Sequence, residues 1–153
     1  MKDIELRLAD QPGSLAAMAL TLGEAGISVE GGGVFVADDI GIAHFLIADH
    51  QAATAADALR RADIEVVAVH DTVLTLLRQD VPGQLGALCK RLADAGVNIT
   101  TQYGDHQGQL ILLVDKATHA QPVLDTWTTR QEPPAEDPPI APVSPGTSGS
   151  LRS

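Results

Sequence analysis

The first residues alternate strictly between apolar and charged positions. Ile4, Leu6 and Leu8 are separated by Glu5 and Arg7, the period of two that is typical of a strand with one buried face. From residue 14 the apolar positions recur at helical intervals as far as residue 25, which predicts a helix with one buried side. We expect further strands at about residues 27–36 and 40–48, a helix at about 52–62 and a strand at 64–69.

The pattern then occurs a second time. Asp-Gln-Pro-Gly-Ser-Leu at residues 10–15 recurs as Asp-Val-Pro-Gly-Gln-Leu at 80–85, and a block at 22–29 recurs at 92–99. Both blocks are displaced by 70 residues, from 10 to 80 and from 22 to 92, which is a small domain's length rather than that of a solenoid unit. We therefore predict an α+β protein with two ferredoxin-like βαββαβ repeats, each with two helices on one face of an antiparallel sheet.

The second repeat is shorter than the first. Helical spacing at 85–95, strand patterns at 97–103 and 109–114, and a helix at about 120–127 with Pro122 in its first turn account for its apolar residues. No fourth strand is evident. We expect the free edge of its sheet to be covered by a homodimer contact or by a strand from elsewhere in the chain, because an open edge pairs readily.

Domain limits follow from the repeat and from the C-terminal composition. We place the first domain at residues 1–71 and the second at 72–130. The stretch 131–153 contains Pro133, Pro134, Pro138, Pro139, Pro142 and Pro145 among its few apolar residues. Because such a segment can neither form a regular hydrogen-bond ladder nor bury much apolar surface, we predict a disordered tail.

Charge and motifs exclude several functions. The formal net charge of −10 repels both nucleic acid and anionic membrane surfaces. No apolar run is long enough for a spanning helix, and the single Cys89 has no disulfide partner, so we expect a cytoplasmic protein. The five histidines lack metal-ligand spacing, and no nucleophile, phosphate or dinucleotide motif occurs. We expect no metal, no cofactor and no catalytic residue.

The repeated Pro-Gly loops could serve only as strand-to-helix connectors, but their chemistry also suits a small ligand. Each loop leads into a helix N-terminus, where unpaired N–H groups favour an anion. Gly13 and Gly83 let a ligand approach the backbone, and Asp10 and Asp80 could either cap the helix or attract an ammonium group. With the amide of Asn98 nearby in sequence, the set suits a zwitterion such as a free amino acid.

At these residues the sequence resembles the ACT domain family of small regulatory modules in amino-acid metabolism. The second copy is the closer match and looks like the serine-binding regulatory domain of phosphoglycerate dehydrogenase. The resemblance covers about residues 2–129 and implies that ligands lie between two domains, with the Pro-Gly loop of one facing the second strand of the other. It implicates Asp80, Val81, Pro82, Gly83, Gln84, Leu85 and Asn98 in the second copy and Asp10, Gln11, Pro12, Gly13, Ser14, Leu15 and Ser28 in the first.

The two candidate sites are not equivalent. Ser28 stands where the second copy has Asn98, and its shorter side chain implies a weaker site or another ligand. Gly31, Gly32 and Gly33 replace Thr101, Gln102 and Tyr103, either to let two backbones or a ligand come close or simply as a flexible bulge.

Our leading hypothesis is a non-catalytic regulatory protein that binds an amino acid at the seam between ACT-like domains and responds by rearrangement. Its partners would be the amino acid, a second copy of the chain and a regulated protein. The alternatives are a structural assembly module without a small ligand and a small enzyme that uses the seam as an active site.

Overall fold

The computed structural model describes residues 1–78 and 80–131, with side chains to residue 128. The segment 132–153, which holds nearly all of the predicted tail, lies outside the described residues. The first repeat consists of β1 (Lys2–Ala9), α1 (Ser14–Glu24), β2 (Gly31–Ala37), β3 (Ile40–Ile47), the short 3-10 helix η1 (Asp49–Gln51), α2 (Ala52–Arg61) and β4 (Glu65–Asp71).

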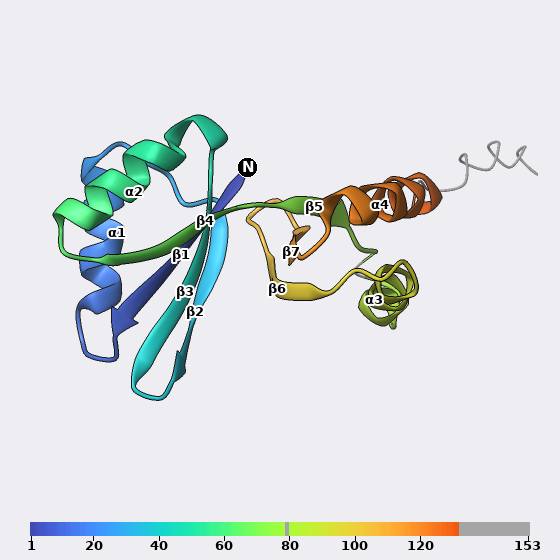
Figure 1. Cartoon of the computed structure of the whole chain (residues 1–153), viewed down its shortest axis with the longest axis horizontal. Coiled ribbons are helices and arrows are strands. Elements are labelled where there is room, and N and C mark those ends of the chain that lie inside the picture. The colour runs from blue at the N-terminus through green and yellow to red at the C-terminus, as the bar shows by residue number, and fades with distance from the viewer. Residues whose placement is uncertain (79, 132–153) are drawn as a thin grey trace, which may run out of the picture.

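The first sheet has the strand order β2-β3-β1-β4, and all its pairs are antiparallel. The alternation at the N-terminus works as predicted, because Ile4 and Leu6 are fully buried beneath the helices. Met18 and Leu22 of α1 and Leu59 of α2 meet them in one core. Both helices cover the same face of the sheet (Figure 1), as the βαββαβ prediction requires.

The second repeat consists of β5 (Val73–Leu76), α3 (Gln84–Asp94), β6 (Ile99–Gly104), β7 (Gln109–Val114) and α4 (Ala117–Gln131). Its sheet has three strands in the order β5-β7-β6, and Leu88, Leu92, Leu112 and Leu124 form its core. The two-repeat α+β prediction is confirmed, and among the described residues the second sheet has no fourth strand.

Two elements begin three or four residues away from their predicted starts. The strand expected from residue 27 begins at Gly31, because residues 26 and 27 close α1 first: Gly26 has a φ of 71° and the Ile27 amide donates to the Leu22 carbonyl. The last helix begins at Ala117, not at 120, so Pro122 lies inside the helix rather than in its first turn.

The free edge of β5 is partly covered from within the chain. Helix α4 lies against β5, and the indole Nε1 of Trp127 donates a hydrogen bond to the Leu76 carbonyl at 3.1 Å. Among the described residues, β7 is the only strand that pairs with β5. A helix of the same chain therefore covers this part of the edge, and the expected contact with a second copy stays a prediction.

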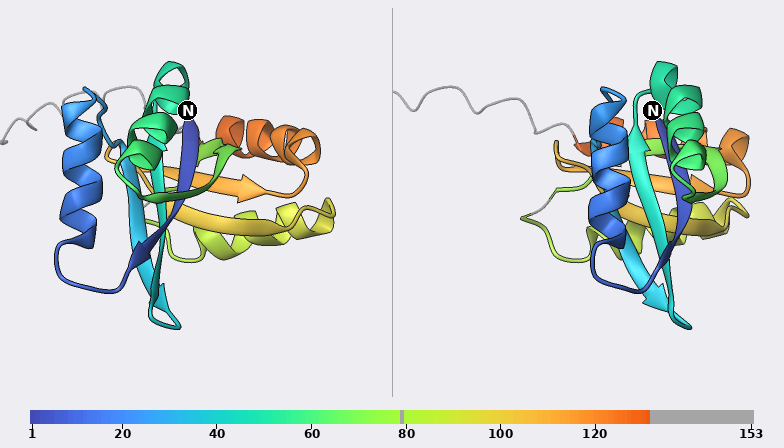
Figure 2. Two further views of the ribbon diagram at one scale, coloured as in Figure 1. Left: turned by 60° about the vertical axis from the view of Figure 1, so that its left-hand side comes forward. Right: turned by 90° about the vertical axis from the view of Figure 1, so that its left-hand side faces the viewer.

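The two sheets meet at the middle of the molecule, with the helices of each repeat on the far sides (Figures 1 and 2). Thr72 alone separates β4 from β5. Leu46 of the first sheet packs against Tyr103, Ile111 and Leu113 of the second. The sheets are also joined at one point by a backbone bridge between Gly31 and Asp105.

None of the helices in the described part of the chain is both long enough and apolar enough to cross a membrane.

Candidate ligand-binding site

Both Pro-Gly loops end on a glycine in a left-handed conformation. Gly13 has a φ of 95° and Gly83 a φ of 86°, and each is the N-cap residue of the helix that follows. Neither α1 nor α3 has a side-chain hydrogen bond at its N-cap. The carboxylates of Asp10 and Asp80 therefore do not cap these helices, and the positive end of each helix dipole faces an open loop.

Space beside both glycines is also open. A Cβ atom added to Gly13 or to Gly83 would have no other atom within 4 Å. A ligand can therefore approach the backbone at these two positions, as the sequence suggested. The strain of a positive φ favours glycine there.

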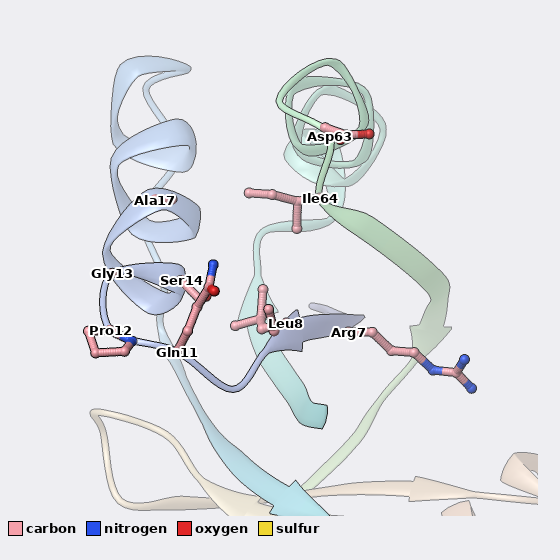
Figure 3. Close-up of a pocket in the computed structure, with 10 residues that line it drawn as sticks. Arg7, Leu8, Gln11, Pro12, Gly13, Ser14, Ala17, Asp63 and Ile64 are labelled. Atoms are coloured by element: carbon pink, nitrogen blue, oxygen red, sulfur yellow. The ribbon is translucent and has the colours of Figure 1, made fainter. Parts of the chain in front are cut away.

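The first loop borders a pocket of about 270 Å³ (Figure 3). Gln11 and Ser14 point toward Ile64 in the gap between α1 and the start of β4. Arg7 also lines the pocket, but its guanidinium points away and lies 3.6 Å from the carboxylate of Glu65. The other polar groups that line the pocket are the loop backbone, the Gln11 amide, the Ser14 hydroxyl and the Asp63 carboxylate.

A smaller hollow of about 110 Å³ lies on the β2 side of the same loop. It is lined by Asp10, Leu15, Val34 and Val36 together with neighbouring residues of β1 and β3. The first loop therefore separates two hollows, one beside β4 and one at the edge strand β2.

The second loop is open to solvent. Asp80, Pro82, Gly83 and Leu85 are exposed, while Val81 and Gln84 are half-buried. Asp80 lies 3.5 Å from the guanidinium of Arg78, so its charge is already partly balanced.

Ser28 and Asn98 lie away from the loop of their own repeat. The first loop follows Ala9, which pairs with Ile40, whereas Ser28 precedes Gly31, which pairs with Leu46 at the opposite end of β3. The second repeat has the same geometry, since Leu76 pairs with Gln109 and Ile99 with Val114. The resemblance implies that a Pro-Gly loop faces Ser28 or Asn98. Such a contact can therefore form only between two repeats or between two copies of the chain.

Within the chain, the second Pro-Gly loop and the segment that contains Ser28 lie at the same end of the second sheet. The second loop leaves β5 at the Gln109 end of its sheet, and this is the end at which Asp105 bridges Gly31. The amide of His106 donates to the Glu30 carbonyl at 2.9 Å there. The segment that contains Ser28 thus adjoins the end of the second sheet from which the second loop emerges.

Sequence reasoning missed a buried polar cluster between the sheets. Asp3 is fully buried, accepts a hydrogen bond from the Tyr103 hydroxyl at 2.7 Å and lies 2.9 Å from Nδ1 of His44. The hydrogen bond to Asp3 raises the pKa of His44, although burial opposes this rise. Burial, together with the same carboxylate, raises the pKa of Tyr103 well above its usual range.

A charged residue at alternate positions of a strand was the available signal, since Asp3 and Glu5 share one face of β1. Sequence periodicity names that face but not the residue that covers it, which is 100 positions away. Among the described residues, no group of three or more histidine, cysteine or acidic side chains is arranged to hold a metal ion.

No protein-family model matches the sequence, and no curated protein matches it. Solved structures do match. Protein BT0572 from Bacteroides thetaiotaomicron has a TM-score of 0.70 and 21% identity over 82% of this chain and 87% of its own. The regulatory subunit of aspartate kinase from Thermus thermophilus has a TM-score of 0.66 and 20% identity over 86% and 92%. That of Thermus flavus has 0.63 and 18% over 82% and 90%.

The chain has a tandem ACT-type fold. At these identities the likeness concerns the fold alone. In the first ACT-type repeat, a pocket lies beside the Pro-Gly loop and its open glycine. In the second repeat, the loop also has an open glycine, but Asn98 lies at the other end of the sheet.

Proposed function

We propose that this protein is a non-catalytic regulatory protein that binds a free amino acid between two ACT-type domains. The observation that carries the proposal is the pair of uncapped helix N-termini, each behind an open left-handed glycine. Such a site offers backbone N–H groups to a carboxylate. The similar Thermus proteins are regulatory subunits of aspartate kinase by name, which supports a regulatory role here.

The full site needs a second domain beside each loop. Strand β2 is an edge strand without a charged residue, and Asp105 bridges its outer side only at Gly31. The rest of this edge, residues 32–37, is a template for pairing. Antiparallel pairing with β2 of a second copy would set the Ala37 end of one strand beside the Gly31 end of the other. Because the first loop lies at the Ala37 end and Ser28 precedes Gly31, this homodimer would bring the two together.

Helix α1 supports the same contact. Leu15 is 51% exposed and Leu20 is 65% exposed, and the only charged residue of the helix is Glu24. The equivalent position of Leu20 in the second repeat is Lys90, which is exposed and pairs with Asp94 at 2.8 Å. The fold does not require an apolar residue at this position. The exposed apolar face of α1 therefore favours contact with another apolar surface, such as α1 of a second copy.

Binding at such a seam would act by rearrangement. A ligand that contacts both domains in only one arrangement stabilises that arrangement by its difference in affinity. An amino acid of about seven heavy atoms at about 1 kcal/mol per atom would bind with micromolar affinity or weaker. That range suits the sensing of intracellular amino-acid levels.

Thermal-shift measurements on the full chain with each common amino acid at millimolar concentration test the proposal. We expect at least one amino acid to raise the melting temperature. If none does, the structural assembly alternative is favoured. The enzyme alternative would instead require turnover that Asp80→Ala abolishes.

The loop assignment has its own matched pair of variants. Gly83→Val places a side chain at the open N-cap, with a backbone strain of about 1–2 kcal/mol, and should reduce the amino-acid shift strongly while the fold survives. Gly86→Val lies one turn further along α3, also in open space but with an ordinary φ, and should retain the shift. Equal shifts in both variants would remove the loop from the site.

A further inference from the structure

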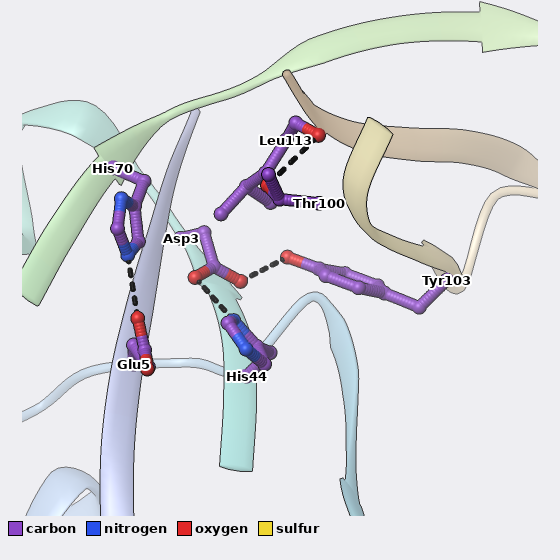
Figure 4. Close-up of polar contacts among 7 residues, drawn as sticks. All are labelled: Asp3, Glu5, His44, His70, Thr100, Tyr103 and Leu113. Carbon is purple, nitrogen blue, oxygen red and sulfur yellow. Dashed lines mark hydrogen bonds and ion pairs between the residues drawn. The ribbon is translucent and has the colours of Figure 1, made fainter. Parts of the chain in front are cut away.

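A buried hydrogen-bond cluster joins the two repeats (Figure 4). Asp3 of β1 shares its two carboxylate oxygens between them: Oδ1 contacts Nδ1 of His44 on β3, and Oδ2 accepts the hydrogen bond of Tyr103 on β6. An ionised carboxylate only accepts hydrogen bonds, so the contact with ionised Asp3 requires a proton on Nδ1 of His44. One buried carboxylate therefore links a titrating ring in the first sheet to a hydroxyl in the second.

His44 supplies the charge that balances Asp3. A fully buried carboxylate is stable only when it is hydrogen-bonded and paired with a positive group. The titratable and charged groups that face His44 are Asp3 and Glu5 on β1, His70 on β4 and Tyr103 on β6, while β2 presents a glycine. His70 is itself bound to Glu5 at 2.8 Å.

The rest of the contact between the repeats has three parts. The covalent link is Thr72, and the apolar part consists of Leu46, Tyr103, Ile111 and Leu113 with Met1 and Leu74 at its margin. At the end of β2, Asp105 bridges Gly31 and the His106 amide donates to the Glu30 carbonyl. These backbone contacts carry no side-chain charge, so the Asp3 cluster is the part of the contact that a change of protonation can alter.

We propose that His44, Asp3 and Tyr103 form a proton-sensitive latch between the two repeats, closed while His44 is protonated and loosened when His44 loses its proton. Neutral His44 still donates to Asp3 but no longer offsets its charge, so the hydrogen bond of Tyr103 is left to stabilise a buried anion. The hydrogen bond to Asp3 raises the pKa of His44. The latch is thus fully closed below about pH 6.5 and is lost as the pH rises through the raised value.

Methyl and imidazole NMR on the full chain test this latch between pH 5.5 and 9. The Ile111 methyl signal, which reports the second sheet, should shift with the same midpoint as the His44 ring, above 6.5. His44→Gln should abolish the Ile111 shift. His119→Gln, at an exposed histidine of α4, should leave it unchanged.

Tyr103→Phe separates a latch from local titration. It keeps the ring and the His44–Asp3 pair but removes the hydroxyl, so His44 should still titrate while Ile111 no longer follows it. The proposal is overturned if Ile111 is silent in the wild-type protein while His44 titrates, or if its shift survives either His44→Gln or Tyr103→Phe. Should His44→Gln fail to fold by circular dichroism, the Tyr103→Phe comparison alone decides. None of these readouts depends on amino-acid binding.

Discussion

The three consecutive glycines of β2 have three different environments. A Cβ atom on Gly31 would lie 2.7 Å from Cα of Asp105, and one on Gly32 would lie 2.1 Å from the His44 carbonyl oxygen. At Gly33 the nearest atom would be in the Phe35 ring, at 3.5 Å. Gly31 permits the approach of the second repeat's backbone, Gly32 permits the strand to pass β3, and Gly33 is not required by either contact.

Substitution at Gly32 should therefore damage the first sheet. Gly32 also has a φ of 134°, so Gly32→Ala combines a clash with backbone that cannot move and a strained conformation. We expect a loss of about 3 kcal/mol or more in the free energy of unfolding, measured by urea denaturation.

Gly33→Ala is the matched control at the neighbouring position. Its new methyl group would make an ordinary contact with Phe35, and we expect a change within about 1 kcal/mol. If Gly32→Ala and Gly33→Ala lower the free energy of unfolding by the same small amount, β2 must move to relieve the clash with the His44 carbonyl.

At the level of elements, α4 covers part of the edge of β5 that a fourth strand would pair with. Trp127 is 3% exposed, packs into the core of the second repeat and donates to the Leu76 carbonyl of β5. Arg91 of α3 lies over its ring at 5.1 Å. One side chain thus fills the core, binds a backbone carbonyl of a partly unpaired strand and contacts the adjacent helix.

Removal of this side chain should destabilise the second repeat selectively. Trp127→Ala is expected to lower the free energy of unfolding by about 3–5 kcal/mol, and hydrogen exchange should increase in β5 more than in β1. Trp127→Phe keeps most of the apolar contact and loses only the N–H, so its effect should be about 1–2 kcal/mol. Uniform exchange across both repeats in Trp127→Ala would show that they unfold as one unit.

Sequence patterns predicted the elements better than their ends. The alternation around Ile4 and the helical stripe around Met18 depend on burial within one repeat, and both were predicted correctly. The predicted start of β2 was wrong because Ile27 closes α1 before the strand begins. The helix across Pro122 was placed too late, because tertiary contacts of Ala120 and Leu124 hold a proline that local preference would put in the first turn.

The candidate site was predictable only in part. The left-handed glycines could be anticipated because Pro-Gly before a helix has a local cause in the backbone. The positions of Ser28 and Asn98 at the far ends of their sheets depend on strand direction, and the Asp3–Tyr103 contact depends on how two sheets pack. Neither has a local signature in the sequence.

For the whole molecule, the net charge and the exposed apolar residues have opposite effects on self-association. A charge of −10 disfavours self-association, yet α1 and β2 themselves contain a single charged residue, Glu24. Val36 of β2, at 57% exposed, lines the same hollow as Leu15, so the apolar surface of α1 reaches the strand edge there. This is the side on which two acidic copies can meet with the least repulsion.

Leu20→Lys tests the dimer, because it gives α1 the residue that α3 already has at the equivalent position. The fold should therefore tolerate it, while the proposed contact between two copies should be lost, and light scattering should show a shift from dimer to monomer. Ala53→Lys adds the same charge on the exposed side of α2 and should leave the dimer intact. A wild-type monomer, or a Leu20→Lys dimer, would contradict the contact through α1.

The strand order also has a consequence for the order of folding during synthesis. All four strands of the first sheet precede Thr72, so this sheet can close on the ribosome before any of the second repeat has emerged. Asp3 would then lie in a finished sheet before Tyr103, which is 100 residues further along the chain than Asp3, has been made. This polar contact thus joins the first strand of one repeat to a strand that is made much later, and a nascent chain stalled before residue 103 would hold Asp3 without the Tyr103 hydroxyl.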